Sequence, residues 1–367
     1  MRGGLCGVKQ LSSGKRELES KERVHIEGTF GGKYRVFAIF IICVALLGAA
    51  FAVSSIWRTT ESGQDFFDRI GAFFGEDADE SREPSSPPPQ SEQEPSREPL
   101  LEGDPIPEGA VIVRGADLSY LSLGEQYYLN ETDYAPGIEA LLARELDLSV
   151  AATGEPLVLI VHTHTVEAYL PKETSYIEGS VSAATYSEDA ERNMLAVGRV
   201  LADQLNENGI PTIQCTRTHT GDGMSLQGAY AREAESVREY LRLYPSIRLV
   251  IDLHRDAVMN AEGEYVRTEA PQEDGFAQVM AVVGSDANGT PCNWEGNLAL
   301  ALQLRRALNT GDSGLARPVY LRKSSFNQEL AEYSLLLEIG TGANTVEEAK
   351  RTAQRVGDAL SKLIVHS

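Results

Sequence analysis

Three segments of the chain each combine a short apolar run with a residue that can do chemistry, histidine in two of them and glutamate in the third. They are residues 157–164 (LVLIVHTH), 249–255 (LVIDLHR) and 335–340 (LLLEIG). Nearly unbroken apolar runs of this length are typical of buried strands in a parallel sheet. Open parallel sheets bind their ligands beyond the carboxyl ends of the strands. We therefore expect the three segments to converge on one cleft.

The histidines of these segments have the pattern of a metal site. Catalytic zinc takes three protein ligands from His, Asp, Glu and Cys and keeps one position open. His162 and His164 form an HTH triplet after the first run, and His254 ends the second. Because side chains alternate along a strand, His162 and His164 share a face only if the strand continues through them. Otherwise one is a ligand and the other supports it.

The third ligand has two candidates. Asp189 precedes a helix expected over residues 190–208, where it could cap the helix and still present an oxygen to the cleft. A plain helix cap is the alternative role for this residue. Glu167, three residues after His164, is the next candidate for the ligand.

Glu338 is the expected catalytic residue, because a carboxylate inside LLLEIG would be costly to bury without a task or a partner. A buried carboxylate beside zinc can act as a general base towards water and return the proton to a leaving amine. The alternative is a structural ion pair, for which Arg255 is one partner. Asp252 and Asp256 flank His254 and are expected to support the site, since histidine ligands commonly donate their second N–H to a carboxylate.

The sequence before residue 110 predicts a membrane anchor and a tether. Residues 36–56 form an uncharged apolar run of 21 residues, long enough to cross a bilayer, and eight Lys or Arg precede it. A cleaved signal peptide is the alternative. We assign residues 1–35 to a cytoplasmic basic arm and 36–57 to a single transmembrane helix. We expect residues 58–109 to form a juxtamembrane segment and an acidic, Pro/Ser/Glu-rich disordered linker.

Residues 110–367 are expected to form one extracytoplasmic domain. Strands near residues 157–161, 211–215, 249–253, 278–283, 319–322 and 335–339 alternate with helices near 190–208, 226–243, 297–308 and 346–363, and a further helical period covers 136–148. This alternation indicates an α/β fold with a largely parallel or mixed sheet and helices on both faces.

Charge and motif content exclude several classes of function. The formal net charge of −21 argues against nucleic acid as a partner, since binding depends on neutralising phosphates. The chain has no G-x-S-x-G elbow, HEXXH helix or Walker loop. Outside the membrane, Cys215 and Cys292 could form one disulfide, but the fold does not require it.

The quoted motifs resemble a known family. HTHTVEAYLP (162–171), IDLHRDA (251–257) and LLLEIGTGAN (335–344), after a membrane anchor and an acidic tether, are similar to stage II sporulation protein P of endospore-forming Firmicutes. The same segments more distantly resemble zinc-dependent N-acetylmuramoyl-L-alanine amidases. That resemblance implies that His164, Asp189 and His254 bind zinc and that Glu338 is catalytic. Apart from the resemblance, His162, Glu167 and Arg255 are further candidates for binding or supporting the metal. Aspartate at position 189, where the amidases have glutamate, is a departure.

The resemblance implies a peptidoglycan hydrolase that cuts the amide between N-acetylmuramic acid and L-alanine, with cross-link endopeptidase activity also attributed to the family. It further implies location in the septal membrane between mother cell and forespore during engulfment. A lytic transglycosylase and a membrane scaffold protein would be partners there. A zinc peptidase acting only on cross-links and a non-catalytic wall-binding scaffold are the alternatives.

Overall fold

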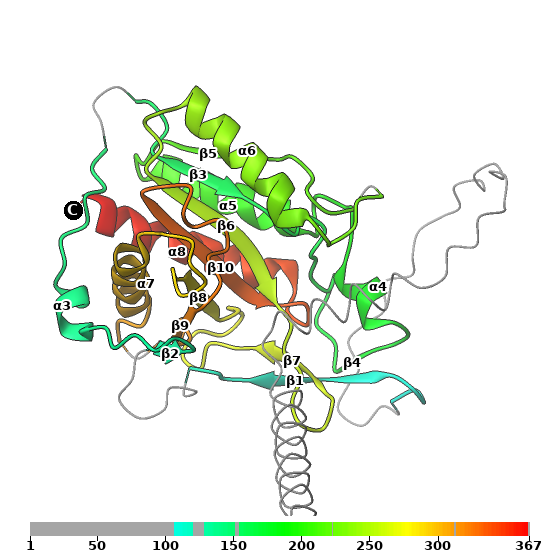
Figure 1. Cartoon of the computed structure of the whole chain (residues 1–367). Coiled ribbons are helices and arrows are strands. Elements are labelled where there is room, and N and C mark those ends of the chain that lie inside the picture. Colours follow the sequence, from blue (N-terminus) through cyan, green and yellow to red (C-terminus); the bar gives the residue numbers. More distant parts are fainter. Residues whose placement is uncertain (1–105, 120–127, 151–153, 222, 312, 366–367) are drawn as a thin grey trace, which may run out of the picture. The chain divides into compact units, whose positions relative to one another are not determined.

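The computed structural model describes residues 106–119, 128–150, 154–221, 223–311 and 313–365 (Figure 1). The chain divides into two compact units, Met1–Ala78 and Asp79–Ser367, and the described residues belong to the second. The predicted basic arm, membrane span and linker up to residue 105 lie outside the described residues. Within the described ranges, no helix combines the length and the apolarity needed to cross a bilayer.

The second unit contains a seven-stranded sheet. In chain order its strands are β2 (Tyr128–Asn130), β3 (Val158–Val161), β5 (Thr212–Gln214), β6 (Leu249–Asp256), β8 (Val279–Gly284), β9 (Val319–Arg322) and β10 (Tyr333–Thr341). Their order across the sheet is β2-β9-β8-β10-β6-β3-β5. Strands β10, β6, β3 and β5 are parallel, as are β8, β9 and β2, and the two groups meet at the antiparallel pair β8–β10. The fold is therefore α/β with a mixed sheet, as the sequence predicts.

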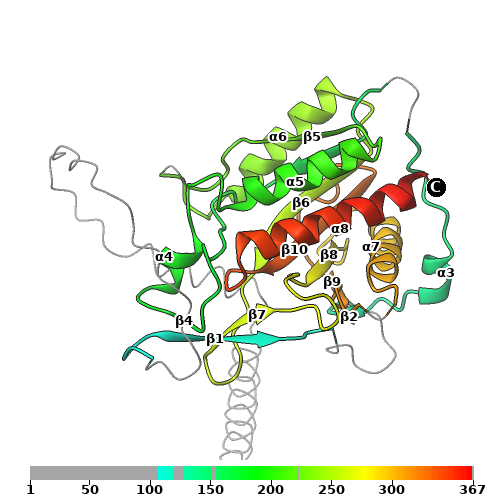
Figure 2. The ribbon, with the colours of Figure 1, turned by 180° about the vertical axis from the view of Figure 1, so that it is seen from behind.

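Helices cover both faces of this sheet. Helices α5 (Met194–Glu207), α7 (Trp294–Leu308) and α8 (Val346–Val365) lie together on one face (Figure 2), and α6 (Ala229–Leu243) lies on the other (Figure 1). Val158 and Ile160 of β3 belong to the core cluster shared with α5, α7 and α8, whereas Leu159 and Val161 pack with Val237 of α6. Apolar side chains on both faces explain why these strands read as continuous apolar runs.

The turn from β10 into α8 is fixed by side-chain hydrogen bonds. The Glu348 carboxylate accepts a hydrogen bond from the Thr345 amide at 2.7 Å, and the Glu348 amide donates to Thr345 Oγ1 at 3.3 Å. This reciprocal pair is a capping box. The Asn344 carboxamide oxygen also accepts from the amides of Thr341 (2.9 Å) and Thr268 (3.2 Å). The strand that carries Glu338 is thus fixed at its carboxyl end.

A second, three-stranded sheet was not expected from the sequence. It has the order β4-β1-β7, with β1 (Val111–Ala116), β4 (Tyr176–Ile177) and β7 (Tyr265–Thr268). A short helix, α4 (Val181–Thr185), follows β4. These elements have two to six residues, too short for a clear period.

The helix predicted over residues 136–148 is shorter than expected. Only α3 (Ile138–Leu142) is helical, and the Gln303 side chain donates to the carbonyls of Leu141 and Arg144 at its end. Leu146 and Leu148 are buried outside the helix. The apolar spacing that predicted a longer helix therefore comes, at these two positions, from burial of a segment that is not helical. Cys215 and Cys292 are both free, so the optional disulfide is not formed.

The β9–β10 loop (residues 323–332) packs closely against β8. The Gln328 side chain accepts from the Gly284 amide at 2.9 Å and donates to the Val282 carbonyl at 3.0 Å. A Cβ at Gly284 would lie 2.5 Å from the Ser325 carbonyl oxygen and 2.6 Å from that of Ser324. Glycine at this position therefore permits the close approach of the loop.

We predict that Gly284→Ala lowers the free energy of unfolding by about 1–3 kcal/mol, the usual scale for forcing atoms into a filled site. Denaturant unfolding of the purified protein measures this change. Gly137→Ala is the control, because its Cβ would meet nothing closer than Ala140 Cβ at 3.9 Å, and it should change stability by less than about 0.5 kcal/mol. Equal stability of the two variants would contradict the packing argument.

Candidate active site

The three predicted segments end side by side. β10, β6 and β3 are adjacent and parallel, and Glu338 is the register partner of His254. The His164 ring lies 5.2 Å from the His254 ring, centroid to centroid, in an edge-on arrangement. The structure thus brings His164, His254 and Glu338 together at the carboxyl edge of the sheet.

His254 lies between two carboxylates. Its Nε2 is 2.8 Å from Asp252 Oδ2, and its Nδ1 is 3.5 Å from Glu167 Oε2. Burial by itself would lower the pKa of His254, but the charges of Asp252 and Glu167 raise that pKa well above its ordinary value. The Asp252 carboxylate also accepts hydrogen bonds from the Thr163 amide (2.9 Å) and hydroxyl (2.7 Å). Asp252 therefore fixes both the His254 ring and the middle residue of the HTH triplet.

Glu167 is buried and ionised. Its exposed fraction is 1%, and its Oε2 accepts a hydrogen bond from the Arg255 amide at 3.2 Å. Burial raises its pKa, but the charges of Arg255 and His254 outweigh that effect and lower it to about 2. Glu167 therefore presents an anionic oxygen to His254.

Arg255 supplies much of the positive charge around Glu167. Its guanidinium is buried, donates to the Thr185 carbonyl at 3.0 Å and lies 4.8 Å from the centre of the Tyr186 ring. A guanidinium carries no lone pair available to a metal, so Arg255 cannot be a ligand. Of the two roles expected for Arg255, binding the metal or supporting its ligands, the geometry suits the second.

His162 faces α5, away from this cluster. Its Nε2 is 2.9 Å from the Gln214 side-chain nitrogen, and its Nδ1 is 3.4 Å from the Leu253 carbonyl. Burial lowers its pKa to about 4. Gly198 of α5 makes room for the ring, since a Cβ there would lie 2.5 Å from His162 Cε1. Strand β3 ends at Val161, so the two histidines of the triplet take different directions.

Asp189 lies on an exposed turn. Its Oδ1 accepts a hydrogen bond from the Glu191 amide at 2.9 Å, and its described contacts include neither His164 nor His254. Helix α5 begins four residues later than expected, and Asn193 caps it. The structure therefore gives no support to Asp189 as a ligand. The alternative role of helix cap belongs to Asn193 instead, and Asp189 caps only its own turn.

Glu338 has the environment expected of a proton carrier. Burial, followed by the negative charge of Asp256, raises its pKa to about 8. Its Oε2 is buried without a hydrogen-bond partner among the described residues. Asp256 pairs with Arg317 at 2.7 Å. An Arg255–Glu338 ion pair is not among the contacts of the described residues.

Helix α6 and the β9–β10 loop add residues to this cluster that no motif in the sequence predicts. The Tyr230 ring of α6 lies 5.8 Å from the His164 ring, and Phe326 of the β9–β10 loop lies 6.0 Å from Tyr230. Glu233, also on α6, is 2% exposed, and its pKa is raised to about 8 by burial and then by the charge of Asp252. These residues reach the site through tertiary packing.

The side chains of His164, His254 and Glu167 are of the types that bind zinc, although they do not lie in a complete coordination geometry. Among the described residues, no three His, Cys, Asp or Glu side chains have the arrangement of a metal site. The 3.5 Å between His254 Nδ1 and Glu167 Oε2 exceeds a normal hydrogen bond. It lies within the roughly 3.3–3.6 Å that separates two ligands of a tetrahedral ion with bonds of about 2.0–2.2 Å. Two imidazoles and one carboxylate are also ordinary zinc ligands.

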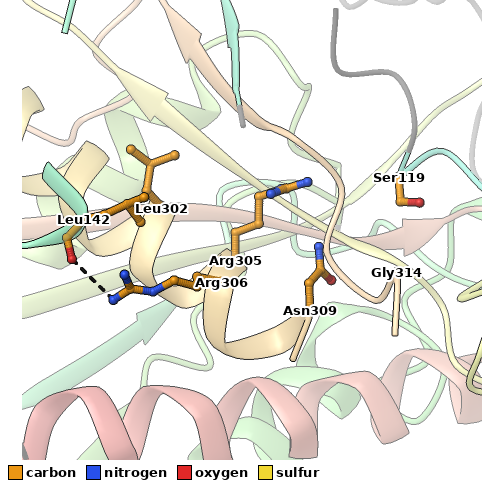
Figure 3. Close-up of a pocket in the computed structure, with 7 residues that line it drawn as sticks. All are labelled: Ser119, Leu142, Leu302, Arg305, Arg306, Asn309 and Gly314. Carbon is orange, nitrogen blue, oxygen red and sulfur yellow. Dashed lines mark hydrogen bonds between the residues drawn. The ribbon is translucent and has the colours of Figure 1, made fainter. Parts of the chain in front are cut away.

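A separate cavity of about 420 Å³ adjoins α7 (Figure 3). Arg306 donates to the Leu142 carbonyl at 3.3 Å, and the Asn309 side chain exchanges hydrogen bonds with the backbone of Ala316. Its polar groups thus hold neighbouring segments against the helix, and none of the predicted site residues lines it. The lining residues are Ser119, Leu142, Leu302, Arg305, Arg306, Asn309 and Gly314.

Comparison with known proteins gives a family match. The model of the family described as stage II sporulation protein P (SpoIIP) matches residues 77–361. Stage II sporulation protein P of Bacillus subtilis (strain 168) is 26% identical over 216 residues, which are 56% of this chain and 51% of that protein. The chain thus spans about half the length of this curated relative.

Several solved structures are similar. The apo form of the N-acetylmuramyl-L-alanine amidase Ami1 from Mycobacterium abscessus has 16% identity and a TM-score of 0.33, covering 59% of this chain and 99% of that chain. The CwlD amidase of Clostridioides difficile, in complex with the GerS lipoprotein, has 12% identity and a TM-score of 0.35, covering 57% and 96%.

We predict that Glu167→Gln weakens zinc binding by at least about tenfold, because it removes the anionic oxygen facing His254. The matched variant Asp189→Asn should leave zinc affinity unchanged within about twofold, since Asp189 holds only its own turn. Competition of each purified variant with a chelator measures the affinity. The reverse order of effects would restore Asp189 as the third ligand.

Proposed function

Because the chain belongs to the stage II sporulation protein P family, we propose that it is a zinc-dependent peptidoglycan hydrolase. Its proposed reaction is hydrolysis of the amide bond between N-acetylmuramic acid and L-alanine. One observation carries the proposal: a carboxyl group with raised pKa, Glu338, lies in register beside His254. That arrangement suits proton transfer next to a metal-binding histidine.

His164, His254 and Glu167 would hold the zinc ion. Burial lowers the pKa of His164 to about 4, so its ring is neutral and able to act as a ligand at neutral pH. Asp252 contacts the Nε2 side of His254 and leaves Nδ1 towards Glu167, so zinc at Nδ1 would have to displace the proton that the raised pKa of His254 retains. The chemistry that a bound zinc ion supplies is Lewis acidity, which polarises a carbonyl and lowers the pKa of water.

Glu338 is the proposed general base and acid. Its buried Oε2 has no hydrogen-bond partner among the described residues, and a cation held by the neighbouring ligands would favour its ionised form, which can accept a proton from a water molecule in the cleft. The raised pKa then lets it pass that proton to the leaving amine of L-alanine at neutral pH.

Arg255 and Asp252 keep this arrangement in place. The buried guanidinium keeps Glu167 ionised, and Asp252 fixes the orientation of the His254 ring. Removal of such supporting partners typically weakens metal binding or activity by 10–100-fold.

The cellular setting is also a proposal. Residues 36–57 would anchor the protein in the septal membrane between mother cell and forespore, and the acidic linker would let the domain reach peptidoglycan. A lytic transglycosylase and a membrane scaffold protein are the proposed partners during engulfment. The apolar run of residues 36–56 and the Pro/Ser/Glu-rich composition after it are the sequence features on which the anchor and the linker of this proposal rest.

Analysis of the products tests the proposed reaction. Purified protein is incubated with zinc and purified peptidoglycan, and the soluble products are separated and identified. Release of stem peptides with a free L-alanine amine supports an amidase. Cleaved cross-links without that amine would instead identify a peptidase, and unaltered peptidoglycan would favour a non-catalytic wall-binding role.

We predict that Glu338→Gln retains zinc but lowers turnover by at least about a hundredfold, the usual lower scale for losing a general acid/base. Glutamine keeps the size of the side chain but cannot take the proton from water. Zinc content and initial rates of the purified variant provide the measurement. Loss of zinc together with activity would recast Glu338 as a ligand, and near-normal turnover would remove it from the mechanism.

We also predict that a protein lacking residues 1–57 is soluble and hydrolyses purified peptidoglycan but fails to support engulfment in cells. The proposed catalytic residues all lie in the second unit, and the removed segment would serve only to localise them. Fluorescence microscopy of sporulating cells and the product assay provide the two readouts. Full function in cells would refute the role of the anchor.

A further inference from the structure

Four aromatic rings form a row that ends at the two histidines. Successive ring centroids are 6.0 Å apart from Phe326 to Tyr230, 5.8 Å from Tyr230 to His164 and 5.2 Å from His164 to His254. Tyr230 meets His164 edge-on at 82°, a favoured arrangement for aromatic rings. Tyr230 therefore limits the directions that the His164 ring can take.

The far end of the row rests on an unusual backbone. Among the described residues, Phe326 and Asn327 are the non-glycine residues with positive φ, at 52° and 57°. Asparagine tolerates this left-handed conformation, but phenylalanine adopts it rarely. Such a conformation persists only where the surroundings fix it, and these outliers cluster at functional sites.

Asn327 ties this loop to the helix that carries Tyr230. Its side-chain nitrogen donates to the Tyr230 carbonyl at 2.7 Å and to the buried carboxylate of Glu233. Helix α6 begins after Gly228, which offers no side-chain cap. The first turn of α6 is thus held by a residue nearly a hundred positions away.

We propose that Asn327 is a positioning residue that, through Tyr230, sets the orientation of His164 for zinc binding. The left-handed backbone aims the Asn327 side chain at α6, and the ring of Tyr230 braces the imidazole. The inference rests on the proposed function, because it takes His164 as a zinc ligand. In this arrangement the β9–β10 loop belongs to the metal site although it supplies no ligand.

Zinc affinity of the purified protein, measured by competition with a chelator, tests this role. Asn327→Gly removes the two side-chain hydrogen bonds but keeps a residue at ease with positive φ. It should weaken zinc binding by about tenfold, the lower end of the range for supporting groups. The control Asn208→Gly removes an exposed hydrogen bond to Asp358 and should leave affinity unchanged.

Substitutions of Tyr230 separate bracing from simple stability. Tyr230→Phe keeps the ring and should retain wild-type affinity, whereas Tyr230→Leu should weaken zinc binding about tenfold. The double variant Asn327→Gly/Tyr230→Leu should bind zinc no more weakly than Tyr230→Leu alone, because both substitutions remove the same bracing of His164. Thermal unfolding of each variant checks that the fold is retained.

The outcomes distinguish this inference from the proposed function. Wild-type affinity in Asn327→Gly or Tyr230→Leu would overturn the positioning role, as would full additivity in the double variant. Reduced zinc affinity of Tyr230→Phe would also overturn it, because the hydroxyl and not the ring would then be what zinc binding requires. Failure of the wild-type protein to bind zinc at all would refute the proposed function itself.

Discussion

The contact of His254 with Asp252 and Glu167 is the interaction on which the strand-end cluster depends. All three side chains are buried, and buried charges are tolerated only when they are paired and hydrogen-bonded. Asp252 extends the pairing to Thr163, two residues after the end of β3, and Glu167 extends it to the backbone of Arg255 on β6. The ends of two strands and the segment after His164 are thereby held in one arrangement. Glu338, in register with His254, takes its position from the same sheet.

The sequence was sufficient to predict the α/β class and the meeting of the three motifs, because long apolar runs identify strands buried on both faces. It could not decide which face each histidine would take. That choice depends on β3 ending at Val161, so that His162 packs against Gly198 of α5 while His164 continues into the cluster. A strand boundary shifted by one residue reverses such an assignment.

The same kind of boundary explains the difference between Asp189 and Glu167. The expected helix began at residue 190, which placed Asp189 at its cap, but α5 starts at Met194 after Asn193. The only local signal for Glu167 is its position three residues after His164, and its role depends on a long-range hydrogen bond from Arg255. Tyr230 and Asn327 are harder still to anticipate, because they come from a helix and a loop with no motif. Their contribution follows from tertiary packing alone.

The central claim is that His164, Glu167 and His254 share one zinc ion beside Glu338. Anomalous diffraction at the zinc absorption edge, from crystals of the zinc-loaded protein, tests it most directly. The account predicts one strong peak within about 2.0–2.2 Å of a nitrogen of each histidine and an oxygen of Glu167. A zinc ion bound by Asp189, or one bound at a position that lacks either histidine, would contradict it.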